Sequence, residues 1–293
     1  MPIGFENEFM YFYLSMLVFV LGACLGSLLN VCIYRIPLDQ SVISPRSHCT
    51  RCGKTIAWYD NIPLLSYVIL RGRCRHCGET FSGRYAFIEG LTAVLFFLVW
   101  LKLGPGPRPL GLVEMSTMAL VPIYWLCIFG LILGTFVDFD HMIIPDRVTI
   151  GGTIAGVVLS AFVPALHDST GFLGGIMMSL LGAVLGGGIL WVVAWVGELI
   201  FKREAMGMGD VKLLSAIGAF LGWKAVLFTI MISSLIGATA GISMVVLGRK
   251  EMKSRIPYGP YIALAAVLWI LWGQGMWDWY GNLLRPGMLG PEL

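Results

Sequence analysis

Charge is scarce in this sequence. Only 13% of its 293 residues are Asp, Glu, Lys or Arg, whereas 57% are hydrophobic. An ordinary soluble domain carries about 25% charged residues, so this composition excludes a water-soluble globular protein. The chain also has no Lys and Arg tract interleaved with aromatic residues, which argues against a nucleic-acid-binding protein. We therefore expect a polytopic membrane protein.

Basic residues are absent from the N-terminus. Residues 1–9 contain Glu6 and Glu8 but no Lys or Arg. A cleavable signal peptide opens with a positively charged region, which this segment does not have. We therefore expect the first hydrophobic segment to remain in the mature protein.

Long apolar runs dominate the rest of the chain. A transmembrane helix needs about 20 mostly apolar residues to cross a hydrocarbon core of about 30 Å. The sequence accordingly predicts an all-α membrane protein with about eight transmembrane helices, at residues 9–33, 86–103, 114–137, 148–166, 172–201, 212–223, 225–247 and 258–280. Glycines four residues apart favour close packing between such helices, and the pairs are Gly22/Gly26, Gly182/Gly186 and Gly237/Gly241.

Lys and Arg are distributed unevenly between the loops. Loop 34–85 holds eight of the 20, and 16 lie in loops that would share one side of the membrane. Since Lys and Arg favour the cytoplasmic side, we expect those loops in the cytoplasm and both termini outside. The predicted organisation is a first transmembrane helix at 1–33, a cytoplasmic loop domain at 34–85 and a transmembrane bundle at 86–293.

Four of the seven cysteines form two Cys-x-x-Cys pairs in loop 34–85. They are Cys49/Cys52 and Cys74/Cys77, separated by 21 residues. This spacing is typical of a zinc ribbon, in which each pair supplies two corners of a tetrahedron. A reducing cytoplasm leaves thiolates free for metal, and a loop of this size builds little core. We predict a structural Zn²⁺; the alternative is a pair of redox or metal-free knuckles.

Carboxylates stand at the ends of predicted transmembrane helices, where an ionisable group is a candidate for function. One group is Asp138, Asp140 and Asp146 in VDFDHMIIPD, and the other is Asp210. The Lys and Arg distribution places both groups at the cytoplasmic border. Two carboxylates brought together there can share a proton, so that one activates water while the other donates to a carbonyl. The pattern favours an aspartic peptidase.

Two glycines, Gly207 and Gly209, directly precede Asp210. Without a Cβ they would let an extended substrate backbone approach Asp210, and we expect them to permit positive φ where the chain enters the helix. The alternative is purely structural: Asp210 caps its helix and Asp138 ends its own at the lipid headgroups.

Five ordered blocks of the sequence resemble the bacterial type IV prepilin peptidases, which are Gly-x-Gly-Asp aspartic peptidases. The blocks are GSLLNVCIYRIP (26–37), CTRCGKTIAWYDNIPLLSYVILRGRCRHCGETFSGRYAFIEG (49–90), DFDHMIIPD (138–146), EAMGMGDVKLL (204–214) and IPYGPYIALAA (256–266). The resemblance implies that Asp138 and Asp210 are the catalytic pair. It also implies a bacterial inner-membrane enzyme that removes the basic leader of prepilins or pseudopilins and methylates the new N-terminus with S-adenosylmethionine.

The methyltransferase half is implied by the resemblance alone, because the sequence has no strand, Gly-rich turn and helix that would indicate a cofactor fingerprint. If loop 34–85 carries this activity, segment 59–67 (YDNIPLLSY) and Glu89 are the residues to test. The alternative for Glu89 is a carboxylate at a span end that reaches the interface.

Three other functions fit part of the pattern. An ion-coupled transporter with a zinc-binding regulatory loop would use the carboxylates as proton relays, but such residues are expected near the bilayer midplane. A scaffold that recruits a partner through the zinc loop would leave the acidic residues unexplained. The third is a peptidase of the same family without methyl transfer.

Overall fold

In the computed structural model of the protein, the described residues are 3–106, 115–202, 206–247 and 257–283. They fold into two compact units, Met1–Gly152 and Thr153–Leu293. Over the described residues the regular secondary structure is helical apart from two isolated antiparallel bridges, His48 with Thr55 and Arg73 with Thr80. The all-α class is confirmed.

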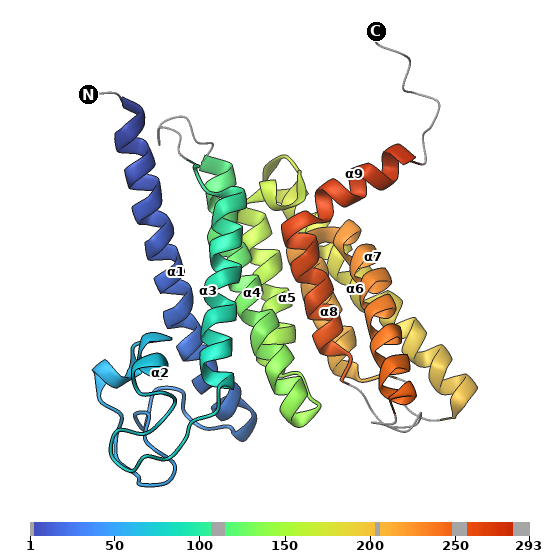
Figure 1. The fold of residues 1–293 in the computed structure, drawn as a ribbon. Helices are drawn as coiled ribbons and strands as arrows, with labels where there is room; N and C mark the ends of the chain where they lie inside the picture. Colours follow the sequence, from blue (N-terminus) through green and yellow to red (C-terminus); the bar gives the residue numbers. More distant parts are fainter. Residues whose placement is uncertain (1–2, 107–114, 203–205, 248–256, 284–293) are drawn as a thin grey trace. The chain divides into compact units, whose positions relative to one another are not determined.

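The first unit contains three long helices, α1 (Ile3–Arg35), α3 (Arg84–Leu103) and α4 (Met115–His141). In Figure 1, α1 runs along α3, and α3 runs along α4. A Cβ on Gly26 would lie 2.6 Å from Cα of Glu89, and one on Gly22 would lie 2.7 Å from Cα of Ala93. The Gly22/Gly26 pair therefore provides the close approach of α1 to α3, as its spacing predicts.

Aromatic contacts hold the same three helices together. The indole Nε1 of Trp100 donates to Oγ of Ser15 at 2.9 Å, which joins α3 to α1. The rings of Phe96 and Trp125 stack with centroids 5.1 Å apart, and Nε1 of Trp125 donates to the Phe96 carbonyl at 3.0 Å. Each indole thus buries its ring while its N–H finds an acceptor.

The loop domain lies between α1 and α3 in the chain and contains little regular structure. Its elements are η1 (Ile36–Leu38), η2 (Trp58–Asn61) and the short helix α2 (Leu65–Ile69). The two bridges flank the two Cys-x-x-Cys pairs, so most of the domain consists of turns around the cysteines. Helix α1 ends at Arg35 and α3 begins at Arg84.

Helix α5 (Asp146–Phe162) crosses the boundary between the units. The second unit continues with η4 (Pro164–His167), α6 (Gly171–Phe201), α7 (Met208–Val246), α8 (Gly259–Leu268), the π-helical turn η5 (Trp269–Gly273) and α9 (Gln274–Leu283). Helices α6 and α7 pack through glycine: a Cβ on Gly182 would overlap the carbonyl of Gly218, and one on Gly186 would overlap that of Leu214. Gly182 and Gly186 thus act as their spacing predicts.

Six helices in the described chain are long and apolar enough to cross a membrane: Glu8–Leu38, Arg84–Leu103, Thr117–His141, Gly171–Ile200, Met208–Val246 and Gly259–Leu283. Eight were predicted, and the difference has two causes. The segment predicted at 148–166 is α5, which with 17 residues lies at the lower limit of the length that can span a membrane. The segments predicted at 212–223 and 225–247 are the two parts of α7, which has a non-helical residue at Gly222.

The interruption of α7 depends on glycine. Gly222 has φ 80° and ψ 175°, a conformation that L side chains rarely adopt. The Ala219 carbonyl, three residues before the interruption, accepts from Oγ of Ser179 at 2.8 Å and lies 3.2 Å from Nε2 of His167. A continuous helix of 39 residues would be about 58 Å long, well beyond a bilayer core, so the interruption makes two shorter helices.

Candidate metal centre and active site

Each Cys-x-x-Cys pair sits in a tight turn with the same backbone pattern. In the first, Cys49 N donates to the Lys54 carbonyl (3.0 Å) and Gly53 N to the Cys49 carbonyl (2.9 Å). In the second, Cys74 N donates to Glu79 O (2.7 Å) and Gly78 N to Cys74 O (2.9 Å). The glycine after each pair has positive φ, +68° for Gly53 and +71° for Gly78. The two turns are therefore equivalent knuckles.

The knuckles bring the four thiols together. The Sγ atoms of Cys49, Cys52, Cys74 and Cys77 all lie within 4.8 Å of one another, and those of Cys49 and Cys77 are 3.7 Å apart. Tetrahedral Zn–S bonds of about 2.3 Å imply S···S distances of about 3.8 Å. All four thiols are free of disulfides. The cluster can therefore hold a metal ion, which agrees with the predicted ligand set.

The protonation of these thiols is set by their surroundings. Hydrogen bonds from the backbone N–H groups of Cys52 and Arg51 lower the pKa of Cys49 to about 6, so this thiol is largely a thiolate at neutral pH. A backbone hydrogen bond from Glu79 also favours the Cys77 thiolate, but desolvation and hydrogen bonds with the other thiols outweigh it and raise the pKa of Cys77 to about 11. A divalent cation would reverse this second effect, since coordination deprotonates thiols.

The segment 59–67 is held by polar contacts. Asp60 forms an ion pair with Arg75, whose Nη2 lies 2.6 Å from Oδ1, and hydrogen bonds from Arg75 lower the pKa of Asp60. Oγ of Ser66 donates to the Tyr59 carbonyl and accepts from Ile62 N, both at 3.0 Å. These contacts fix a compact turn from η2 into α2.

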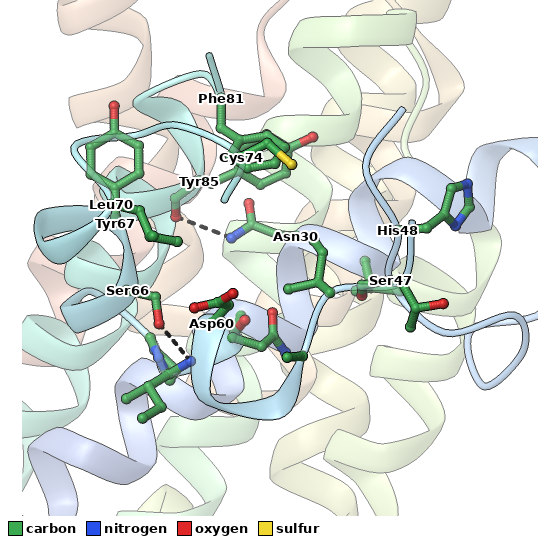
Figure 2. A pocket seen from close by; sticks show the side chains of 18 of the residues that line it. Asn30, Ser47, His48, Asp60, Ser66, Tyr67, Leu70, Cys74, Phe81 and Tyr85 are labelled. Atoms are coloured by element: carbon green, nitrogen blue, oxygen red, sulfur yellow. Dashed lines mark hydrogen bonds between the residues drawn. The ribbon is translucent and has the colours of Figure 1, made fainter. Parts of the chain in front are cut away.

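A cavity of about 850 Å³ lies between the loop domain, α1 and α3. It is lined by Asp60, Ser66 and Tyr67 from segment 59–67 and by Glu89 from α3. Figure 2 shows Asn30 on the same cavity, where its Nδ2 donates to the Tyr85 carbonyl at 3.1 Å. The residues named for methyl transfer thus share one cavity.

Sequence reasoning missed the contribution of α1 to this cavity. Ser27 and Asn30 line it, although both fall inside the first apolar run. Their polarity in such a run was the available signal, because polar side chains in a membrane helix usually face protein or water.

The three acidic residues around the end of α4 have different surroundings. Asp138 is buried, with 6% of its surface exposed. Asp140 is paired with Arg84 through two contacts of 2.7 Å, and Arg84 also donates to the Phe136 carbonyl. Asp146 is exposed at the first position of α5. Burial therefore separates Asp138 from its two neighbours, a distinction that the sequence alone left open.

Asp210 lies in the first turn of α7 and is also buried, at 9% exposure. Its backbone N–H donates to the Gly207 carbonyl at 3.1 Å, and Gly207 is the N-cap with φ −70° and ψ 135°. The expected positive φ is therefore wrong, because extended backbone suffices at Gly207 and Gly209 lies inside α7. Asp210 does sit at a helix N-terminus.

Comparison with known proteins places these residues in a family. The Bacterial Peptidase A24 N-terminal domain matches residues 20–103, and the Type IV leader peptidase family matches residues 125–242. The prepilin leader peptidase/N-methyltransferase of Aeromonas salmonicida (strain A449) is 36% identical over 293 aligned residues, covering 90% of this chain and 92% of that protein. The chain belongs to the type IV leader peptidase family.

Other members of the type IV leader peptidase family are similarly close. A prepilin leader peptidase/N-methyltransferase of Aeromonas hydrophila is 36% identical, covering 90% of this chain and 92% of that protein. One of Myxococcus xanthus (strain DK1622) is 42% identical over 78% of this chain and 63% of that protein. No solved structure matches the chain. The family resemblance inferred from the five blocks is confirmed, and the chain is a multi-pass membrane enzyme of the peptidase class.

Proposed function

We propose that this protein is a bifunctional prepilin leader peptidase and N-methyltransferase, with Asp138 and Asp210 as the catalytic pair of the peptidase. The observation that carries the peptidase assignment is that two carboxylates at the ends of apolar helices, 6% and 9% exposed, are buried. A buried carboxylate at a membrane border is costly unless it has a function. The family match supports the same reaction, since relatives carry that name.

The chemistry follows from a carboxylate pair that shares one proton. The ionised member takes a proton from a water, and the oxygen of that water attacks the scissile carbonyl carbon. The protonated member donates to the carbonyl oxygen, which takes up the electron pair of the broken π bond. The tetrahedral intermediate then collapses as the leaving nitrogen gains a proton and departs as the free amine. Either Asp138 or Asp210 can start as the base.

The surroundings of Asp210 suit an extended substrate. Among the described residues, a Cβ on Gly207 would come within 4 Å of one atom, Oδ2 of Asp210 at 3.5 Å. We assign Gly207 and Gly209 to substrate approach. A backbone that passes close to the carboxylate needs such side-chain-free positions.

The substrates in this proposal are type IV prepilins and the related pseudopilins of secretion systems. Their basic leader would remain in the cytoplasm while the following apolar helix stays in the lipid. The excess of Lys and Arg in loop 34–85 supports a cytoplasmic position for this loop and for the active site at the inner membrane. The enzyme would thus meet the junction between leader and helix at the cytoplasmic membrane border.

The four-thiol cluster is assigned to a structural Zn²⁺, held by Cys49, Cys52, Cys74 and Cys77. Four thiolates in two knuckles match the preference of zinc for closed tetrahedral sulfur sites. The ion would replace a hydrophobic core that a domain of this size lacks. S-adenosylmethionine would supply the methyl group for the second reaction, as the names of the relatives imply.

Mass spectrometry of a prepilin incubated with purified enzyme in detergent tests the peptidase. We expect Asp138→Asn and Asp210→Asn each to reduce leader removal roughly 100- to 10,000-fold, because each removes one half of the acid–base pair. Asp278→Asn is the matched control, since Asp278 is exposed on α9. Cleavage by either of the first two variants within tenfold of wild type would remove that residue from the dyad.

A further inference from the structure

The cavity of the first unit is large enough for two reactants. Its volume of about 850 Å³ falls within the range of about 300–1,000 Å³ that is usual for small-molecule sites. Helices α1 and α3 supply one wall and the loop domain supplies the other. The wall from the loop domain carries Tyr67 and Phe81, with Tyr85 at the start of α3, as Figure 2 shows. Such rings suit the stacking of a purine and the attraction of a sulfonium cation.

Glu89 is held rigidly in the wall that the helices supply. It lies six residues into α3, is 9% exposed, and is backed by the Gly26 contact with α1. Its Oε2 accepts the backbone N–H of Leu64 at 2.8 Å. Leu64 has φ +61° and ψ −49°, an unusual conformation for a side chain that branches at Cγ. Strained backbone of this kind persists where its surroundings fix it, often at functional sites.

Two of the arginines that line the cavity have other partners in the structure. Arg75 pairs with Asp60, and Arg35 donates to the carbonyls of Ser41, Val42 and Pro45. In the part of the chain that the structure describes, no Lys or Arg forms an ion pair with Glu89. A buried carboxylate in this position attracts a cation from a ligand.

The ionisable groups around Glu89 come from the elements packed on α3. Helix α1 and segment 59–67 place these in the cavity: Cys24, Tyr34, Arg35, Asp60 and Tyr67. The rest of the loop domain adds His48, Lys54, Arg73, Cys74, Arg75 and His76. At the corresponding end of α4 the ionisable side chains Asp138, Asp140 and His141 do not line it. Among the groups named, Glu89 and Asp60 are the carboxylates of the cavity, and Asp60 is the one already neutralised by an arginine.

We propose that this cavity is the site of methyl transfer and that the Glu89 carboxylate accepts the proton of the substrate's new α-ammonium group. The inference rests on the proposed methyltransferase function. The trimmed substrate begins at the membrane border with an apolar helix, so its amine enters from the side of α1 and α3, where Glu89 lies. The methyl donor then occupies the side formed by the loop domain.

The reaction balances with these groups alone. Glu89 takes one proton from the α-ammonium, which leaves a neutral amine with a free electron pair. The amine nitrogen bonds to the methyl carbon while the bond from that carbon to the sulfonium sulfur breaks and leaves its electron pair on sulfur. The products are a neutral thioether and a protonated secondary amine. The proton on Glu89 returns to solvent through the cavity.

The variant Glu89→Gln removes the negative charge of this side chain and keeps its size and its hydrogen-bond acceptor. The amide oxygen of Gln can still accept from Leu64 N, so the strained turn keeps its hydrogen bond. Glu198→Gln is the matched control, because Glu198 is an exposed carboxylate near the end of α6 and lies outside the cavity. Mass spectrometry of a prepilin measures leader removal and the added methyl group in the same sample, and titration with S-adenosylhomocysteine measures occupancy of the donor side.

For Glu89→Gln at pH 6.5 we expect methylation about 15- to 30-fold slower than in wild type, because only that fraction of an α-amine is unprotonated at this pH. Leader removal should stay within twofold and the S-adenosylhomocysteine Kd should be unchanged. Because an α-amine has a pKa of about 7.7–8.0, methylation by the variant should rise about tenfold per pH unit up to that pKa and approach the wild-type rate above it. A structural defect would not be rescued in this way.

Three outcomes would overturn the proposal. Methylation by Glu89→Gln at the wild-type rate at pH 6.5 would exclude Glu89 as proton acceptor. A methylation rate of Glu89→Gln that stays below that of wild type by the same factor from pH 6.5 to 9 would also exclude Glu89 as proton acceptor. Loss of S-adenosylhomocysteine binding with normal leader removal would show that Glu89 binds the methyl donor and not the substrate amine. Absence of methylation by the wild-type enzyme would contradict the methyltransferase function itself, which is a separate result.

Discussion

Arg84 and Asp140 form a two-point ion pair: Nη1 lies 2.7 Å from Oδ1 and Nη2 lies 2.7 Å from Oδ2. Arg84 is the first residue of α3, directly after the loop domain, and Asp140 lies two residues after Asp138 on α4. The guanidinium also lies 5.1 Å from the centre of the Phe136 ring. The pair therefore connects the end of the metal-binding loop to the helix turn that carries a proposed catalytic carboxylate.

We expect Arg84→Lys to destabilise the first unit by about 0.5–1 kcal/mol, because Lys cannot reproduce the two parallel hydrogen bonds. Both side chains are about one-third exposed, and solvent screening keeps the effect small. Thermal unfolding in detergent measures it, with Arg46→Lys at an exposed loop position as control. A larger loss in the control than in Arg84→Lys would contradict a specific role of this pair.

Loss of one thiol should abolish metal binding. Cys49→Ser removes a ligand from a closed four-thiol cluster, so we expect the zinc content to fall from one ion per chain to less than 0.1, and protease cleavage within loop 34–85 to rise. Elemental analysis of the purified protein measures the ion. Cys24→Ser should retain the metal, because Cys24 lies on α1 outside the cluster. Full zinc occupancy in Cys49→Ser would disprove the ligand set.

Glycine contacts between α6 and α7 should be intolerant of a methyl group. Gly182→Ala would place a Cβ into the backbone of Gly218, and overpacking of this kind destabilises by about 1–3 kcal/mol. Among the described residues, nothing lies within 4 Å of a Cβ on Gly188 of the same helix, so we expect Gly188→Ala to add up to about 1 kcal/mol of stability from the higher helix propensity of Ala. Chemical denaturation of the two variants compares them directly, and equal stabilities would refute the close packing.

His167 in the η4 turn should make stability depend on pH. Burial lowers its pKa and outweighs the opposing contributions of the Ala219 carbonyl and Asp168. The unfolded chain therefore binds a proton at higher pH than the folded chain. The neutral imidazole contributes fully to the free energy of unfolding above about pH 6.5, the pKa of His in the unfolded chain. This contribution is lost as the pH falls from that value toward the lower pKa of His167 in the folded chain.

We expect the melting temperature of wild type to fall between pH 7.5 and pH 5 by more than that of His167→Gln, which cannot titrate. His141→Gln, at an exposed position at the end of α4, should follow the wild-type curve. If the melting temperature of His167→Gln depended on pH as strongly as that of wild type, another group would have to be responsible for this dependence.

Sequence reasoning succeeded where a single local pattern carries the information. The two Cys-x-x-Cys pairs predicted a four-thiol cluster, since each knuckle forms within a few residues and only its docking to the other is non-local. The Gly22/Gly26 and Gly182/Gly186 pairs predicted close helix contacts because spacing alone aligns them on one helix face. Six long apolar helices are found where about eight spans were predicted, because α5 has 17 residues and the segments predicted at 212–223 and 225–247 form one element, α7, interrupted at Gly222.

The sequence by itself determined the membrane class, the family and the chemistry-bearing residue types, because hydropathy, spacing and residue order are properties of the chain. The tertiary structure decided which side chains share an environment. Asp140 is neutralised by Arg84, which precedes it by 56 residues, whereas Asp138 is buried. Glu89 contacts segment 59–67 through the hydrogen bond from Leu64 N, which forms only when the chain is folded. Burial and long-range pairing depend on packing between distant segments, and no local pattern encodes them.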